Sequence, residues 1–368
     1  MSNVFYKWFK KYFTDPEGII LGFLLVLGFT VVIFMGDMLA PLLAAVVVAY
    51  LLEGLVGWCV AHKLLKRTPA VILIFCLFIL VLFFLNIGIL PLVFGQITQF
   101  FEKLPDMIAK GQQTLLALPQ NYPSFVSEEQ LNQVFVEMGS AARSLGQEVV
   151  SLSLASISGI FVILIYLILV PVLVFFFLMD KKKILDWATG YLPKERGLAT
   201  RIWTEMDQQI GNYIRGKISE ILIVGIVSYV TFAIMGLQYA MLLGVLVGFS
   251  VIIPYIGAVA VTFPVAIIAY FQWGWSSEFA WLMAAYGIIQ ALDGNVLVPL
   301  LFSEAVNLHP IAIIASILVF GGLWGFWGVF FAIPLATLVK SVLASWPRSD
   351  DEDVPPLEVE SKETKAAL

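Results

Sequence analysis

The chain of 368 residues is 60% hydrophobic and only 13% charged, and its mean hydropathy is +0.95. Soluble domains carry about 25% charged residues, so this composition excludes a water-soluble protein and indicates a polytopic membrane protein. Most of the net charge of −5 comes from the segment 346–368, which holds seven acidic and three basic residues. The rest is nearly neutral, so nothing in its charge indicates a nucleic-acid partner.

Three apolar segments near the N-terminus predict membrane spans, which need about 20 apolar residues each. They are Ile19–Phe34, Leu39–Ala61 and Ala70–Phe94, and a short turn at Gly36–Met38 is expected between the first two. Basic residues lie before the first span and between the second and third: Lys7, Lys10, Lys11, Lys63, Lys66 and Arg67. By the positive-inside rule these residues are cytoplasmic.

The segment 96–150 is expected outside the cytoplasm, because it carries six acidic and only three basic residues. Apolar residues recur at helical intervals in its first half, and Ser127 with Gln130 forms a capping-box pattern for a second helix. The residues LPQNYPSF, at 118–125, separate the two helices. These features predict an extracytoplasmic helical hairpin.

A fourth span is predicted at Ile157–Met179, and the cluster DKKK that follows marks its cytoplasmic end. Apolar residues then recur every four positions, which predicts an amphipathic helix at the cytoplasmic interface: Leu198, Ile202, Met206, Ile210 and Ile214. This helix leads directly into a fifth span, Ile218–Gly236. The segment 211–217, GNYIRGK, has the spacing of a phosphate-binding loop, but Ile218 replaces the required Ser or Thr and no strand precedes it.

Residues 221–339 contain only three charged side chains, all acidic. Two long apolar segments here are interrupted in the middle, at Pro254–Gly257 and at Gly321–Gly328. Two topologies fit: eight full spans, or six spans with two re-entrant hairpins arranged as an inverted repeat of 218–270 and 279–339. We favour the hairpins, whose short limbs cannot cross the membrane. The predicted fold class is therefore all-α, with an extracytoplasmic helical insert.

Asp293 is the strongest candidate for a binding site, because an ionised carboxylate at membrane depth is costly and usually functional. Gln290 precedes it by one helical turn and Asn295 follows it closely, so a carboxylate and two amides are offered to a polar solute or cation. The alternative is structural: Asp-Gly-Asn could satisfy backbone groups freed near Pro299. On the functional reading Asp293 is also the main titrating group.

The two interruptions supply further candidates, since broken helices in transporters expose backbone groups to ions and solutes. They contribute Pro254, Tyr255 and Gly257 in the first half and Gly321 and Gly325 in the second. Ordinary kinking or close helix packing is the alternative, because the pairs Gly244/Gly248 and Gly321/Gly325 have GxxxG spacing.

Four further residues lie outside these interruptions. Glu53, in the second span, could carry protons, or it could face an oligomer contact or pair with a polar group there. His309 is more typical of a surface loop residue. Cys59 and Cys76 indicate neither a disulfide framework nor a metal site.

The succession of PYIG, QALDGNVLVP, VNLHP, GGLWGFWG and AIPL resembles the autoinducer-2 exporter (AI-2E) family, most nearly its PerM-type permease branch. Family members are described as exporters of autoinducer-2 or as sodium/proton antiporters. The resemblance implies a homo-oligomer, expected to be a pentamer, in a bacterial cytoplasmic membrane with both termini inside. The acidic tail is not part of the resemblance.

From these patterns we expect five segments: spans 1–95, the insert 96–150, a fourth span and amphipathic helix 151–217, a transport core 218–345 and a disordered tail 346–368. The predicted function is a secondary transporter of a small polar solute by alternating access. A sodium/proton antiporter, with a monovalent cation as its ligand, and a passive channel or scaffold remain alternatives. No catalytic pattern, cofactor or metal ligand set is expected.

Overall fold

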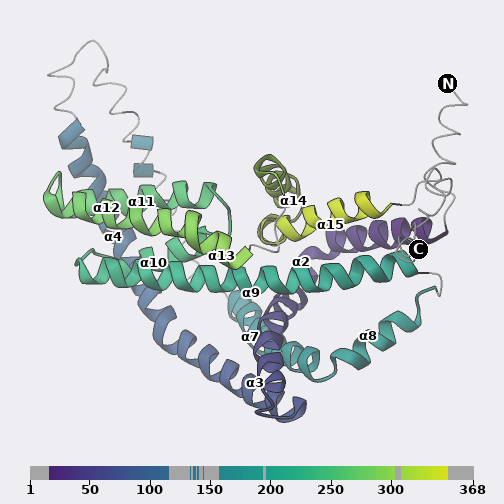
Figure 1. Cartoon of the computed structure of the whole chain (residues 1–368). Coiled ribbons are helices and arrows are strands. Elements are labelled where there is room, and N and C mark those ends of the chain that lie inside the picture. The colour runs from purple at the N-terminus through teal and green to yellow at the C-terminus, as the bar shows by residue number, and fades with distance from the viewer. Residues whose placement is uncertain are drawn as a thin grey trace, which may run out of the picture. The chain divides into compact units, whose positions relative to one another are not determined.

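The computed structural model describes residues 16–115, a few isolated positions between 133 and 144, and residues 157–193, 196–302 and 308–346. In that part of the chain every regular element is helical (Figure 1). The α-helices are α2 (Pro16–Ala61), α3 (Arg67–Phe84), α4 (Leu90–Leu115), α7 (Ile157–Met179), α8 (Lys181–Gly190), α9 (Gly197–Ile234), α10 (Ala240–Ser250), α11 (Ile256–Trp273), α12 (Ser277–Leu292), α13 (Val298–Phe302), α14 (Pro310–Phe330) and α15 (Ala332–Ser345). Single π-helical turns join α3 to α4 (Leu85–Ile89) and α12 to α13 (Asp293–Leu297).

Seven stretches among the described residues are long and apolar enough to cross a membrane. Five of them match expected spans, and Pro310–Phe330 contains the second interruption. Ile256–Trp273 is one limb of the first interrupted segment, so the expectation that this limb is too short to cross is wrong. The helix α7 has the bounds expected for the fourth span. The prediction of a polytopic α-helical membrane protein is therefore confirmed.

Two expected boundaries between elements differ from the structure. The turn expected at Gly36–Met38 is wrong, because these residues are helical within α2. Gly and Asp are poor helix formers by about 1 kcal/mol or less, and the helix continues through them and through Pro41. The helix also does not end near residue 95, where a boundary was expected, because it continues from Arg67 to Gln112. The first helix of the insert is thus an extension of the third span, and the predicted second helix, with Ser127 and Gln130, lies outside the described residues.

The chain divides into two compact units. Unit 1 comprises residues 1–37, 185–210 and 308–368, and unit 2 comprises 38–184 and 211–307. The division falls inside α2 and α9, so each of these helices contributes to both units.

In unit 1 the amphipathic part of α9 buries the predicted apolar stripe. Ile202 and Met206 pack with Leu21 of α2 and Val342 of α15. The N-terminus of α9 is capped by the Glu17 carboxylate, which accepts hydrogen bonds from the backbone N–H of Leu198 at 2.8 Å and of Gly197 at 3.2 Å. The stripe periodicity is confirmed, and this face packs against α2 and α15. The position of the helix at the cytoplasmic interface stays a prediction.

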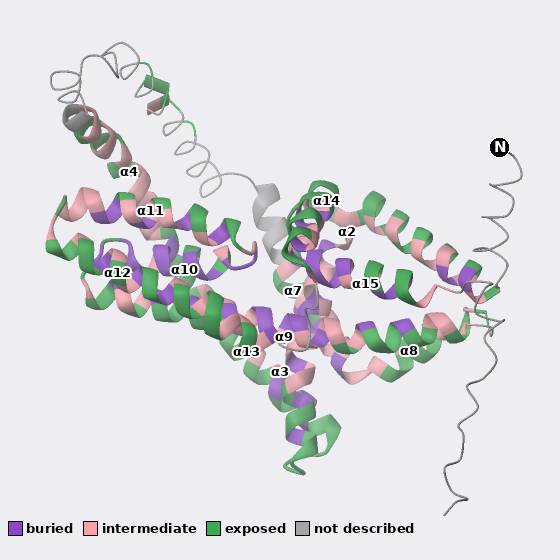
Figure 2. Ribbon diagram, turned by 45° about the horizontal axis from the view of Figure 1, so that its top comes forward, coloured by how far each residue is buried: buried purple, intermediate pink, exposed green. Residues whose placement is uncertain are grey.

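Unit 2 contains two clusters of buried apolar side chains (Figure 2). One joins α2, α3 and α7, with Val56, Val71 and Val174 fully buried. The other joins the second half of α9 with α10, α11 and α12, and α4 packs against it. Close helix crossing is possible because Gly244 and Gly248 of α10 lie against the α9 backbone; a Cβ on Gly248 would stand 2.8 Å from the Ile221 carbonyl oxygen. The GxxxG reading of this pair is therefore supported.

Both interrupted segments fold back on themselves as helical hairpins. In a straight helix, residues seven or eight apart are separated by about 10–12 Å. Yet a Cβ on Gly257 would lie 1.7 Å from the Ser250 carbonyl oxygen, and one on Gly328 would lie 1.8 Å from that of Phe320. Each reversal also contains a residue of positive φ, Tyr255 at 63° and Gly325 at 57°.

The base of the first hairpin is closed as well. The side-chain oxygen Oε1 of Gln272 accepts a hydrogen bond from the Gln238 backbone N–H at 2.7 Å, and the side-chain Nε2 of Gln272 donates to the Gly236 carbonyl at 2.8 Å. These contacts join the start of α10 to the end of α11. The segment therefore turns back rather than crossing as one kinked helix. The sides to which the two hairpins open stay a prediction.

We expect Gly257→Ala to destabilise the protein by about 2 kcal/mol or more, because the added methyl must displace the Ser250 carbonyl. Gly287→Ala in α12 is the matched control, since a Cβ there meets nothing within 4 Å. Removing a mid-helix glycine should stabilise by about 0.5–1 kcal/mol, so the two variants should shift thermal unfolding in detergent in opposite directions. Equal shifts of the unfolding temperature in the two variants would contradict the close approach of Gly257 to the Ser250 carbonyl.

The membrane sides are tested by labelling single cysteines at Gln120 and Lys182 in a background lacking Cys59 and Cys76. An impermeant thiol reagent applied to intact cells should label the first and not the second, as the distribution of basic residues predicts. Labelling of Lys182→Cys alone would reverse the proposed orientation.

Candidate functional site

Asp293 begins a π-helical turn within a long apolar helix. The turn spans Asp293–Leu297, and the Val298 N–H donates to the Asp293 carbonyl, five residues back. Its cause is Pro299, which has no N–H and whose ring would clash with the carbonyl of Asn295 in a regular α-helix. Single π turns are frequent at functional sites because they reorient side chains inside a continuous helix.

The same device occurs in the third span, where Leu85–Ile89 forms a π turn before Pro91. In both turns an asparagine side chain donates a hydrogen bond to the backbone carbonyl four residues back. Asn86 Nδ2 donates to Leu82 O and Asn295 Nδ2 donates to Ala291 O, each at 2.8 Å. The recurrence supports the structural reading for Asn295, whose amide satisfies the backbone.

A buried ion pair on α9 lies in the same unit. Lys217 Nζ donates to Glu220 Oε2 at 2.6 Å, and the two side chains are only 4% and 3% exposed. Lys217 also donates to the Val251 carbonyl at 3.0 Å, at the end of α10 where the first hairpin reverses. Its ammonium lies 5.1 Å from the centre of the Phe302 ring. One cation therefore connects α9, the hairpin tip and α13.

Asp293 interacts electrostatically with both members of this pair. Its Oδ1 is buried and accepts no hydrogen bond from any described residue. With all three groups ionised, the cluster of Lys217, Glu220 and Asp293 has a net charge of −1. A buried carboxylate oxygen without a donor normally has a solute, ion or water as its partner.

Gln290 belongs to a separate polar chain beside this cluster. Its Nε2 donates to the Tyr286 hydroxyl at 2.8 Å, and the Thr262 hydroxyl lies 3.3 Å from the same oxygen. Thr262 is on α11 and Tyr286 is buried on α12, so the chain links the first hairpin to the helix that carries Asp293.

The remaining candidates are distributed over both units. Pro254, Tyr255 and Gly257 form the reversal of the first hairpin, close in sequence to the Val251 carbonyl that Lys217 binds. Gly321 and Gly325 form the matching reversal in unit 1. The structure thus brings Asp293 together with the first hairpin, and it describes the second hairpin as a separate part.

Two candidates have identifiable partners. Arg67 makes two hydrogen bonds to the Glu53 carboxylate, at 2.8 and 3.2 Å, and a third to the Leu178 carbonyl at 3.1 Å. This supports the reading of Glu53 as one half of an ion pair. His309 Nδ1 accepts from Ile311 N at 3.2 Å and caps α14.

Lys217 and Glu220 were not among the candidates predicted from the sequence, because Lys217 was assigned to the cytoplasmic helix and Glu220 was placed in the fifth span without a role. A signal was present: the spacing KxxE, directly at the start of a span, places both charges on one helical face. Tyr286 and Thr262 carried no comparable signal, since single hydroxyls are common in apolar helices.

Comparison with known proteins gives a consistent picture. Residues 22–348 match the family described as AI-2E family transporter. The chain is 47% identical to "Putative permease PerM" of Escherichia coli K12 over 94% of this chain and 98% of that protein. It is 28% identical to "Putative transport protein YueF" of Bacillus subtilis, over 84% of each. It is 24% identical to "AI-2 transport protein TqsA" of Escherichia coli K12, over 88% of this chain and 92% of that protein.

We expect Lys217→Met to destabilise the protein by about 3–5 kcal/mol, because it leaves Glu220 as an unpaired buried charge. Replacing both residues, with Lys217→Met and Glu220→Leu, should recover most of that loss, since a buried ion pair contributes little net stability over apolar groups. Measuring the thermal unfolding of these two variants and of Glu220→Leu completes a double-mutant cycle for the ion pair. A double variant no more stable than Lys217→Met would show that the pair is not the source of the effect.

Proposed function

The chain belongs to the AI-2E transporter family, and from this membership we propose that it is a secondary transporter of a small polar solute across a bacterial cytoplasmic membrane. Autoinducer-2 is one such solute, since a relative carries that substrate in its name. The relatives are named as permeases and transport proteins, which agrees with the lack of a catalytic pattern in the sequence. A homo-oligomeric state, for which we expect a pentamer, belongs to the same proposal.

The observation that carries the proposal is the Asp293 carboxylate, with a buried oxygen that no described group satisfies. Asp293 falls inside the span Ser277–Phe302, about 14 Å along the helix from its nearer end. Keeping charge at such depth costs several kcal/mol, so charged groups there are usually retained for transport. A solute rich in hydroxyls would donate to Asp293 and accept from Gln290, which fits a small polyol.

Alternating access would use the first hairpin as a gate. Lys217 binds the Val251 carbonyl at the hairpin tip while it pairs with Glu220. A displacement of the tip must break the bond to Val251 and leave Lys217 with its carboxylate partner. A solute or proton that changes the charge around Asp293 changes the attraction on Lys217, and this links occupancy of the site to the position of the tip.

A sodium/proton antiporter is the second candidate, and the net charge of −1 in the cluster favours it. Asp293 could then exchange its proton for a monovalent cation. The two functions are separated in proteoliposomes by a pH-sensitive dye. A sodium jump should move protons only in the antiporter, whereas an autoinducer-2 gradient should drive solute flux only in the permease. A passive channel would show neither coupling nor saturation.

We expect Asp293→Asn to abolish proton-coupled exchange and to remove the pH dependence of flux, because an amide does not titrate. Flux of a neutral polyol should fall about tenfold and keep no pH dependence, since one charge-assisted hydrogen bond is weakened. Thermal stability must be measured on the same sample, because a lost structural role would lower stability without changing the pH profile. Wild-type flux with wild-type pH dependence in a stable variant would exclude Asp293 from the site.

A further inference from the structure

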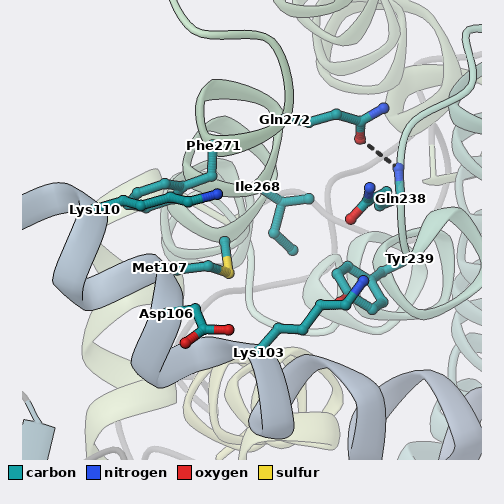
Figure 3. A pocket seen from close by; sticks show the side chains of 9 residues that line it. All are labelled: Lys103, Asp106, Met107, Lys110, Gln238, Tyr239, Ile268, Phe271 and Gln272. Carbon is teal, nitrogen blue, oxygen red and sulfur yellow. Dashed lines mark hydrogen bonds between the residues drawn. The ribbon is translucent and has the colours of Figure 1, made fainter.

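Unit 2 contains a polar cavity whose lining includes no residue of the proposed transport site. It has a volume of about 330 Å³ and lies between α4, the connection from α9 to α10, and α11 (Figure 3). Pockets that bind small molecules have volumes from about 300 Å³ upwards. Lys217, Glu220 and Asp293 are not among the residues that line it.

The charged wall of this cavity comes from one face of α4. Lys103, Asp106 and Lys110 are spaced three and four residues apart, so their side chains project on the same side of the helix. Figure 3 shows the Lys103 side chain extending across the cavity towards Tyr239. No described carboxylate forms an ion pair with Lys103. The charged side chains that line this wall are thus two lysines and one aspartate.

The opposite wall is rigid and offers amides and aromatic rings. Gln272 is fixed by its two hydrogen bonds to the backbone of Gly236 and Gln238. The Tyr239 ring packs edge-on against Phe100, with ring centres 5.7 Å apart. Burial raises the pKa of the Tyr239 phenol, which therefore stays neutral near pH 7. An anion in the cavity would thus lie between the lysine side chains of α4 on one side and side-chain amides and aromatic rings on the other.

Contacts beside the cavity join its two walls. The Gln96 side chain of α4 accepts from the Leu242 N–H in the first turn of α10, at 2.8 Å. The Tyr239 hydroxyl lies 3.5 Å from the Gln99 carbonyl. The helix α4 is therefore attached to the base of the hairpin whose tip Lys217 binds, and a ligand in the cavity would bridge the same two elements.

Aromatic side chains close in sequence to Phe271 and Gln272 lead us to expect the cavity at the level of a membrane surface. Tyr270, Trp275 and Phe279 pack edge-to-face at the end of α11 and the start of α12, with ring centres 5.3–6.3 Å apart. Such clusters of Tyr and Trp gather at the headgroup level. The lysines also lie beyond the apolar part of the helix that continues from α3.

We propose that this cavity is a binding site for a hydroxylated phosphate anion with the chemistry of a glycerophosphate group. The ammonium groups of Lys103 and Lys110 would bind the phosphate as point charges, while the amides of Gln238 and Gln272 face the hydroxyl groups. Either a soluble phosphate ester or the headgroup of phosphatidylglycerol would supply this chemistry.

The test uses the purified full chain in nanodiscs of phosphatidylcholine. Binding of glycerol 1-phosphate by calorimetry would identify a soluble source. Retention of phosphatidylglycerol over phosphatidylcholine in native mass spectrometry, without binding of glycerol 1-phosphate, would identify the lipid. In either case, replacing both cavity lysines, with Lys103→Gln and Lys110→Gln, should weaken binding about tenfold or more.

Two controls make the result specific. Lys182→Gln on α8 removes the same charge from an exposed helix and should leave binding unchanged. Asp106→Asn should tighten binding about threefold, because it removes the one negative charge from the wall. The proposal is overturned if neither probe binds, if Lys182→Gln weakens binding as much as the cavity variant, or if Asp106→Asn weakens it. None of these readouts involves transport, so they are independent of the proposed function.

Discussion

A polar group buried in an apolar protein must find a partner within the protein, and this constraint shapes every irregular feature of the structure. At the two π turns and at the first hairpin, specific side chains satisfy backbone groups. Asn86 and Asn295 donate to carbonyls at the two π turns. Gln272 closes the base of the first hairpin, and Lys217 binds a carbonyl at its tip. Four buried polar atoms of the described residues lack such a partner: Gln209 Oε1, Ser228 Oγ, Asp293 Oδ1 and Trp324 Nε1. Only the Asp293 oxygen belongs to a carboxylate, and for this reason we propose it as a site.

Much of this architecture could be predicted from sequence, because breaks in apolar segments are visible as proline and glycine. Pro254 and Gly257 marked the first reversal, and the segment from Gly321 to Gly328 marked the second. The break at Asp293 was also expected from Pro299, although a π turn rather than a kink accommodates it. In each case the residue type acts locally, so no knowledge of distant contacts was needed.

The features that escaped prediction depend on contacts between distant segments. Lys217 looked cytoplasmic because it follows a run of charged residues, and its burial requires Val251 and Phe302 from other helices. The turn expected at Gly36–Met38 failed for the opposite reason. Glycine and aspartate weaken a helix without breaking it, and neighbouring helical residues on both sides hold these positions in α2. A residue that weakens a helix can be recognised in the sequence, but the distant segments that pack around it cannot.

The two hairpins have the same kind of reversal but different chemistry around it, and the difference bears on their roles. At the first, the tip carbonyl of Val251 is held by a charged group whose own partner is a carboxylate, so its surroundings respond to charge. At the second, the rings of Phe29, Phe320 and Trp324 stack with centres 5.8–6.4 Å apart. Stacked rings have no titratable group, so charge or protonation does not alter their packing. The tip of the first hairpin is bound by a charged group, while the tip of the second contains no charged residue. We therefore expect the first hairpin to be the one that responds to a solute, and Asp293 lies in the unit that contains it.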